Sequence, residues 1–438
     1  MTTNRLTLAT RLLIAGDAVS SLGSGLVLPL TLIYLHQVRG IALPLVGVLL
    51  AGSAALGLVA VPLAGVLIDR VGARPVLVTV LVAQGLSEAG LAWAHSVPTA
   101  LPSMLLLGIS MGPFFPAFTM MMAGINPDPN VQQRAFALNF TVLNAGIGAG
   151  GGIGAAVANV HHPGSFQILF LANALSCVLF AGLLTRLPNP RAHRDSAPGQ
   201  RQPSQRQPQP QSGQPQPEQP KPGYRDVLAQ RGLRTVMIAS LMLAFTGYAA
   251  LDSGLPAYAT VKAHVSVHVV ALAITVNTVI IVAAQLAVLR LLRVLRRSRA
   301  LMAVGLIWGV AWAVFGLAAL PAAAGLRVAC VFAFAGLFGL GETFMAPTIA
   351  PLVNSLAAER VRGRANALSS VAYSIAFVVS PAIATGMIAG GLAVVWIGLL
   401  CLGCLGTALL GVRLGRQLTH AQDRVEPTVA RAPEPTPV

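Results

Sequence analysis

Residues 65–75 read GVLIDRVGARP and place one aspartate and two arginines in a short stretch of an otherwise apolar region. Apolar runs at about 44–68 and 75–94 meet at this point. Each run supplies the roughly 20 apolar residues that an α-helix needs to cross the hydrocarbon core of a bilayer. We therefore predict that residues 65–75 form a charged loop between two membrane-spanning helices.

The whole chain has the composition of a membrane protein. Of its 438 residues, 55% are hydrophobic and 10% are charged, whereas soluble domains average about 25% charged residues. Lipid cannot satisfy an exposed backbone, so the spans are expected to be α-helices. Twelve apolar segments are long enough to span: 12–35, 44–68, 75–94, 101–123, 135–159, 165–186, 235–258, 268–289, 300–320, 328–352, 365–389 and 392–412. The predicted fold class is an all-α polytopic membrane protein with 12 transmembrane helices.

Basic residues fix the expected orientation of these spans. With the N-terminus inside, all but three of the 29 lysines and arginines fall on the cytoplasmic side, and the exceptions are Arg39, Lys262 and Arg327. Such a bias follows the positive-inside rule. It predicts cytoplasmic N- and C-termini in a bacterial plasma membrane. It also accounts for the formal net charge of +16 without any nucleic-acid partner.

A polar segment divides the spans into two sets of six. Residues 188–223 are rich in proline and glutamine, a composition that cannot bury a core. It predicts a disordered cytoplasmic linker. The predicted domains are an N-terminal six-helix bundle at 1–187, the linker at 188–234, a C-terminal six-helix bundle at 235–412 and a cytoplasmic tail at 413–438.

The two halves resemble each other in sequence. RAFALN at 134–139 has a counterpart in RANALS at 364–369, and LLGISMGPFFPAF at 106–118 aligns with LFGLGETFMAPTI at 337–349 at nearly the same offset. Parallel six-helix repeats related by an axis along the membrane normal form a known transporter architecture. The repeat therefore predicts two six-helix halves in a pseudo-twofold arrangement.

The loop at 65–75 resembles the signature loop of the major facilitator superfamily, G-x-L-x-D-R-x-G-R-[KR]. It departs from that pattern at Ala73, where the family usually has a basic residue. In the family, this loop latches one half against the other on the cytoplasmic side and releases when the transporter changes state. The resemblance assigns the latch to Gly65, Asp69, Arg70, Gly72 and Arg74. The alternative is that the two arginines serve only as topology anchors.

Two further stretches bear on this resemblance. The matching loop of the second half, LRLLRVLRRSR at 289–299, has five arginines and no acid, so the latch is expected to be one-sided. The glycine-rich run at 144–154 resembles the antiporter motif of drug–proton exporters but lacks the usual proline. Its small residues are expected to allow tight helix packing.

Four acidic residues fall inside the predicted spans: Asp17, Glu88, Asp252 and Glu342. An ionised carboxylate at the bilayer centre costs at least about 2.5–3.5 kcal/mol, so such a group faces a wet cavity, stays protonated, or both. In the family, spans one, four, seven and ten line the central cavity. The resemblance therefore assigns Asp17, Asp252 and Glu342 to proton coupling or to pairing with a cationic substrate, with a structural hydrogen bond as the alternative. Glu88, on the usually peripheral span three, is expected to be structural.

Polar and aromatic residues of the spans are further candidates for the cavity wall. Aromatic and methionine side chains form adaptable apolar walls in binding sites, although in membrane helices they also pack or face lipid. The expected lining residues are Phe114, Phe115, Tyr248, Asn277, Gln285, Phe344 and Tyr373.

No metal or organic cofactor is expected. Cys401 and Cys404 have the spacing of a metal or redox pair, but no second pair or nearby histidine supports such a site. The four cysteines all lie in apolar runs and are expected to be buried hydrophobes.

These features favour a secondary active transporter that works by alternating access and exports small amphipathic or cationic compounds in exchange for protons. The expected partners are a small-molecule substrate, protons and the lipid bilayer, and the expected state is a monomer. An importer or metabolite permease of the same fold is the first alternative. A membrane-embedded enzyme is the second, and the chain has no H-E-x-x-H, Asp-rich or G-x-S-x-G motif to support it. A sensor that does not transport is a further alternative.

Overall fold

The computed structural model describes residues 6–126, 128–189, 224–292, 294–321 and 323–423, and this part of the chain is helical with no strands. The first half contains α1 (Leu8–Val27), α2 (Leu30–Ile33), a π-helical turn (Tyr34–Val38), α3 (Leu43–Val71), α4 (Ala73–Ala92), α5 (Val97–Ile125), α6 (Pro129–Val157) and α7 (Pro163–Leu184). The second half contains α8 (Tyr224–Ala229), α9 (Arg231–Thr246), α10 (Tyr248–Val261), α11 (Val267–Leu292), α12 (Arg297–Leu317), α13 (Ala324–Leu356), α14 (Glu359–Ala389), α15 (Ala393–Gly415) and α16 (His420–Asp423).

Twelve helical segments in the described ranges are long and apolar enough to cross a membrane, which confirms the predicted fold class. The domain boundaries differ in detail. Residues 190–223 of the predicted linker lie outside the described residues. Residues 224–234 are wrongly placed in the linker, because α8 and the start of α9 occupy them. The last span also continues to Gly415, and the predicted tail contains α16.

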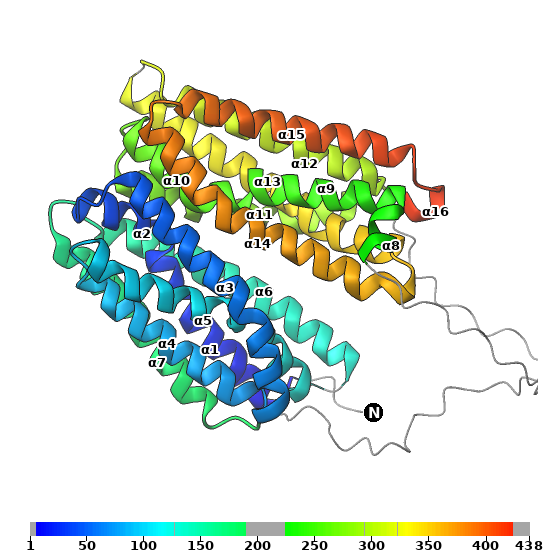
Figure 1. Cartoon of the computed structure of the whole chain (residues 1–438), viewed down its shortest axis with the longest axis horizontal. Coiled ribbons are helices and arrows are strands. Elements are labelled where there is room, and N and C mark those ends of the chain that lie inside the picture. The colour runs from blue at the N-terminus through cyan, green and yellow to red at the C-terminus, as the bar shows by residue number, and fades with distance from the viewer. Residues whose placement is uncertain (1–5, 127, 190–223, 293, 322, 424–438) are drawn as a thin grey trace, which may run out of the picture.

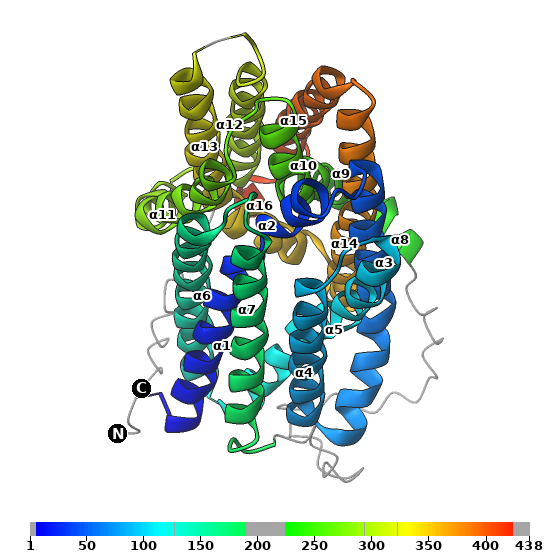
Figure 2. The same ribbon diagram turned by 90° about the vertical axis from the view of Figure 1, so that its left-hand side faces the viewer.

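Two helical bundles lie side by side, one built from α1–α7 and the other from α9–α15 (Figures 1 and 2). The halves meet mainly through two helix pairs, α3 with α14 and α6 with α11. In the repeat, α3 corresponds to α11 and α6 corresponds to α14, so each pair joins the second span of one half to the fifth span of the other. The two contacts are therefore equivalent under a pseudo-twofold axis.

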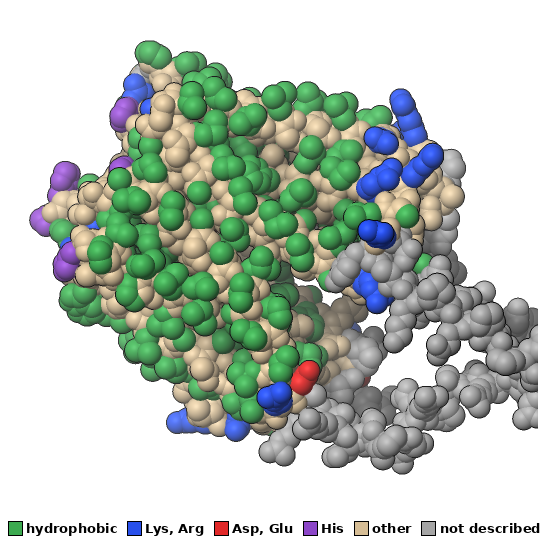
Figure 3. Space-filling model, viewed as in Figure 1, with side chains coloured by type: hydrophobic (Ala, Val, Ile, Leu, Met, Phe, Trp, Pro, Cys, Tyr) green, Lys and Arg blue, Asp and Glu red, His purple; other side chains and the backbone are tan. Residues whose placement is uncertain are grey.

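The two halves touch at one end and separate at the other. Histidine side chains gather at the first end, which we call the histidine-rich end (Figure 3). There, Thr275 donates a hydrogen bond to the Gly148 carbonyl at 3.0 Å, and the His268 ring forms a hydrogen bond with the Ala155 carbonyl. Gly47 of α3 packs directly on Thr385 of α14. At the opposite, arginine-rich end, the surface is hollowed between the halves (Figure 3). The structure is thus closed at the histidine-rich end and open at the arginine-rich end.

The seventh span is broken at Gly247, although the sequence predicted one continuous helix at 235–258. The break separates α9 from α10, and Gly247 has φ −99° and ψ −111°. A freed backbone carbonyl inside a membrane needs a donor. Trp312 supplies it, because its indole nitrogen donates to the Thr246 carbonyl at 2.7 Å. The side chain of Trp308 lies so close to Gly247 that a Cβ would collide with it.

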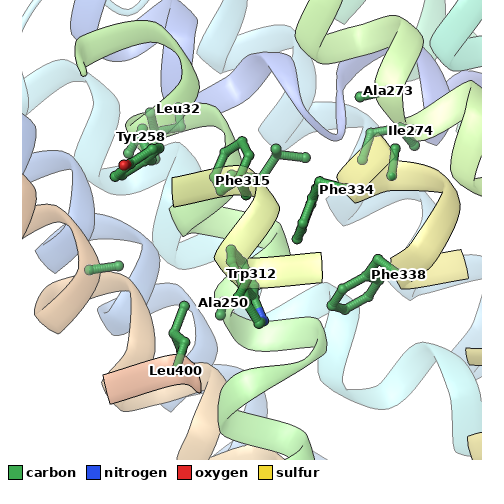
Figure 4. Packing of buried hydrophobic residues seen from close by; sticks show 14 of the residues in the cluster. Leu32, Ala250, Tyr258, Ala273, Ile274, Trp312, Phe315, Phe334, Phe338 and Leu400 are labelled. Carbon is green, nitrogen blue, oxygen red and sulfur yellow. The ribbon is translucent and has the colours of Figure 1, made fainter. Parts of the chain in front are cut away.

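Aromatic rings hold the second half together around this break. Trp312 stands 4.7 Å from Phe334 between ring centroids, and Phe315 stands 4.6 Å from the same ring (Figure 4). Tyr258 of α10 packs on Phe315 at 4.9 Å and donates to the Gly316 carbonyl at 3.0 Å. Ring pairs at these separations add to the stabilisation from buried area alone. These rings therefore pack α10, α12 and α13 together.

Small residues, by contrast, bring the helices of the first half together. Gly150 of α6 faces the backbone of Leu22 and Gly25 on α1, and a Cβ on Gly150 would overlap the Leu22 carbonyl. Gly154, one turn further along, faces Leu26 in the same way. These contacts confirm that the glycine-rich run at 144–154 serves close helix packing.

Candidate functional site

The first buried carboxyl belongs to Asp17 on α1. This side chain is 2% exposed, and the Asn139 amide nitrogen on α6 donates to its Oδ2 at 2.9 Å. The amide oxygen of Asn139 is buried and, among the described residues, accepts no hydrogen bond. The pair therefore presents a carboxyl group and an unused acceptor beside it, an arrangement that suits a proton or another hydrogen-bond donor.

The second buried carboxyl belongs to Glu342 on α13. The Asn277 amide nitrogen on α11 donates to Glu342 Oε2 at 3.0 Å. The phenol of Tyr248 on α10 also lies beside this carboxyl group. Tyr373 of α14 lies close to Tyr248 and donates to the Met345 sulfur at 3.8 Å, one turn after Glu342 on α13. Residues of α10, α11 and α13 therefore meet at Glu342, and α14 adds Tyr373 beside them.

Both carboxyl groups are tied to the helices that join the two halves. Asn139 lies on α6 and Asn277 lies on α11, and these two helices pack against each other across the interface. A movement at this interface would shift the donor that each carboxyl group uses. Asn277 was predicted from the sequence as a lining residue, whereas Asn139 was missed. A signal for Asn139 was present, because this residue ends the repeated RAFALN stretch and aligns with Ser369 in the second half.

Asp252 differs from the other two acids. It is partly exposed, and no hydrogen bond to it is found among the described residues. It lies four residues after Tyr248 on α10, so both side chains project from the same face of that helix. Asp252 is therefore placed near the Glu342 cluster without being part of its hydrogen bonds.

Glu88 occupies a separate place between α4 and α7. It is 4% exposed and lies beside Asn173 of α7. Helix α4 packs against α3, α5 and α7 of its own half. This position away from the interface agrees with the structural role expected for Glu88.

The predicted lining residues fall into two groups. Tyr248, Asn277 and Tyr373 gather around Glu342, as described above. Phe114 packs on Phe118 at 6.0 Å within the first half, whereas Phe115 is 73% exposed. No described contact brings these two phenylalanines, Gln285 or Phe344 to a buried carboxyl, so their role as lining residues stays a prediction.

Comparison with known proteins places the chain in a family. The family model described as Major Facilitator Superfamily matches residues 13–333 and 238–436. The chain belongs to the major facilitator superfamily. It is therefore a transporter rather than an enzyme, and its described helices are those of a multi-pass membrane protein.

Curated relatives of this superfamily match part of the chain. The "Uncharacterized MFS-type transporter YttB" of Bacillus subtilis is 27% identical over 172 residues, and the "Quinolone resistance protein NorA" of Staphylococcus aureus is 28% identical over 170 residues. Each match covers 39% of this chain and 42% of the relative. The aligned part thus spans about two fifths of each relative's length.

Solved structures of the superfamily match nearly the whole chain. A bacterial homologue of the human lysosomal transporter Spinster, in an inward-facing and unoccupied conformation, has a TM-score of 0.64 at 13% identity and covers 95% of this chain and 96% of its own. A D-xylose–proton symporter has a TM-score of 0.67 at 14% identity, covering 95% and 99%. The nucleoside transporter NupG reaches 0.68 at 10% identity, covering 94% and 99%. These similarities show the shared fold.

The superfamily's signature loop joins α3 to α4 in this structure. Gly72 has a φ of +93°, which favours glycine, and it sits against Asn189. Arg74 donates to the Leu187 carbonyl at 2.7 Å, so it is bound to the end of α7 in its own half. Asp69 and Arg70 are exposed, and the described contacts include none from either to the second half. The role of Gly65, Asp69 and Arg70 as a latch therefore stays a prediction.

Neutralising Asp69 is expected to favour the state seen here. If Asp69 latches the halves when the arginine-rich ends come together, Asp69→Asn weakens only that closed state. Spin labels at Gln133 and Ser355, on opposite halves at this end, should then report more long distances than in the parent protein. Asp69→Glu keeps the charge and should leave the distances unchanged. An unchanged distribution in Asp69→Asn would count against the latch.

The counterpart loop of the second half does receive an acid, from a part of the chain that the sequence analysis did not consider. Asp423 of α16 accepts hydrogen bonds from the Ser298 backbone nitrogen and from its hydroxyl, both at 2.8 Å. A carboxylate at this position caps α12 and complements its dipole. In the first half, Asn189 takes the equivalent place and accepts from the Arg74 backbone nitrogen at 3.3 Å.

The described ranges contain no group of three or more His, Cys, Asp or Glu residues that could hold a metal ion. Cys401 and Cys404 are free thiols, and Cys404 is buried, consistent with packing roles.

Proposed function

We propose that this superfamily member exports small amphipathic or cationic compounds in exchange for protons, by alternating access, across a bacterial plasma membrane. The observation that carries the proposal is the Glu342 cluster, in which Asn277 and Tyr248 surround a buried carboxyl group on a membrane-spanning helix. The proposal places both termini and the arginine-rich end in the cytoplasm, in keeping with the positive-inside rule.

One carboxyl group can serve both the proton and the cation. An isolated carboxylate within the membrane is unstable, so it requires either a bound proton or a positively charged partner. Aromatic faces such as those of Tyr248 and Tyr373 also attract cations. Because the proton and the substrate would compete for the same oxygens, binding of one favours release of the other, which is the requirement for exchange.

The distribution of charge favours this reading over an anion or sugar importer of the same fold. The fully buried charged residues in the described ranges are acidic: Asp17, Glu88, Glu342 and Asp423. A permease for anionic substrates would more naturally carry a buried arginine or lysine. The relative NorA is named for quinolone resistance, which also supports export of foreign compounds.

Transport into everted membrane vesicles tests this proposal. In vesicles that contain the protein and are acidified inside, a fluorescent cationic dye should accumulate, because protons leaving through the protein drive dye inward. Vesicles without the protein give the background. A protonophore should abolish the accumulation. Dye uptake that persists without a proton gradient, or no uptake of any cation from a panel of toxic compounds, would contradict the proposed function.

A further inference from the structure

A basic groove lies between α12 and α15 at the arginine-rich end, on helices that take no part in the main contacts between the halves. Its volume is about 240 Å³, and its walls include Arg296, Ser298, Arg299, Gly411, Gly415 and Arg416. Gly411 allows α15 to approach α12 closely, because a Cβ on this residue would lie 2.8 Å from the Met302 backbone nitrogen. The groove therefore combines a close helix contact with three guanidinium groups.

The three arginines of the groove have unused hydrogen-bond donors. Within the described residues, no side-chain hydrogen bond or ion pair involves Arg296, Arg299 or Arg416, and the last two are exposed. Asp423 caps α12 beside the groove, and both of its oxygens are bound to Ser298. Among the described residues, the three guanidinium groups of the groove therefore have no acidic partner.

The equivalent place in the first half is filled by the protein itself. There, Arg74 donates to the Leu187 carbonyl, and Asn189 donates to the Val71 carbonyl at 3.1 Å while covering Gly72. The first half has no need of an external anion at this position. In the second half, Arg297 donates to the Gln422 carbonyl at 3.5 Å. Arg296, Arg299 and Arg416 have no such carbonyl partner among the described residues.

Apolar surface continues from the groove along the membrane-spanning part of α15. Leu405, Leu409 and Val412 follow one face of this helix, and they are 48%, 60% and 42% exposed. Arg416 follows this apolar face at the end of α15, and basic side chains gather at this end of the molecule (Figure 3). This order of charges and apolar surface matches a phospholipid, whose phosphate lies at the membrane surface and whose acyl chains extend into the core.

We propose that this groove binds the phosphate of an anionic phospholipid headgroup through Arg296, Arg299 and Arg416. The bound acyl chains lie along the exposed face of α15. Arginine suits this role because its planar guanidinium donates two parallel hydrogen bonds to phosphate oxygens. The site is independent of the transported substrate and of the direction of transport.

Native mass spectrometry of the full-length protein tests the lipid site. The protein in detergent is titrated with phosphatidylglycerol and, separately, with the zwitterionic phosphatidylcholine. We expect tighter binding of phosphatidylglycerol, and we expect the double variant Arg299→Gln/Arg416→Gln to weaken it by roughly tenfold or more. Both side chains are exposed, so their replacement leaves the packing intact. The double variant Arg11→Gln/Arg134→Gln removes the same charge from the first half and should bind like the parent.

Three results would overturn the proposal. Equal loss in both double variants would indicate general charge attraction rather than a site. Displacement by soluble glycerol phosphate at the same concentration as the lipid would identify a phosphate-ester site without a role for the membrane. Binding that appears only after residues 424–438 are removed would show that the chain's own C-terminal tail, which contains Glu426 and Glu434, occupies the groove.

Discussion

Replacing Glu342 by glutamine is expected to reduce proton-driven dye transport to the level of vesicles that lack the protein. Glutamine keeps the shape of the side chain and can still bond to Asn277, but it cannot carry a proton or balance a cation. The same reasoning applies to Asp17→Asn and Asp252→Asn. Each variant is assayed in everted vesicles energised by a pH gradient, with protein levels matched by immunoblot.

The chain supplies its own matched control for this experiment. Glu88 is a buried carboxyl on a membrane helix, like Glu342, but it packs between α4 and α7 away from the interface of the halves. We expect Glu88→Gln to transport at the parent rate. A second assay measures the exchange of dye across the vesicle membrane without a pH gradient. A variant that has lost only its proton carrier should still exchange dye, whereas a variant that has lost dye binding should not. Normal gradient-driven transport by all three site variants would refute the coupling assignment.

Adding one methyl group at Gly150 is expected to destabilise the first half strongly. Gly150 faces the backbone of α1, where no side chain can rotate away to make room. Overpacking of this kind costs about 1–3 kcal/mol, and the immobile backbone neighbours place Gly150→Ala at the upper end. The measurement is the free energy of unfolding in mixed micelles, followed by the loss of helical circular dichroism.

Gly152 provides the comparison for Gly150, two residues away on the same helix. A Cβ there would lie 3.6 Å from the Thr275 hydroxyl, which is ordinary van der Waals contact. Gly152→Ala should therefore unfold like the parent protein. Equal destabilisation by both alanine variants would show that α6 requires glycine at these positions for helix flexibility rather than for its close approach to α1.

The sequence was sufficient to predict the spans, because a stretch of about 20 apolar residues has few alternatives to a membrane helix. It was not sufficient to predict the break at Gly247. Glycine is common within continuous membrane helices, so the residue alone does not mark a break. The break becomes tolerable only because Trp312, 66 residues away in the chain, donates to the Thr246 carbonyl.

The carboxyl groups of the site could be predicted individually, but their partners could not. Any acid in an apolar span stands out on energetic grounds. The donors to Asp17 and Glu342 come from residues 122 and 65 positions away, on helices whose orientation hydropathy does not determine. For the same reason, the cap that Asp423 provides for α12 could not be found by searching the loop at 289–299 for an acid.

The aromatic surroundings of the seventh span give the protein a built-in optical reporter. Three of its four tryptophans touch this span: Trp308 packs on Gly247, Trp312 bonds Thr246, and Trp396 packs on Gly254. The fourth, Trp93, is 55% exposed at the far end of α4. Once Trp93 is replaced by phenylalanine, intrinsic emission originates only from the rings around α9 and α10. Any bending of this span during a transport cycle then changes the emission spectrum without an attached dye.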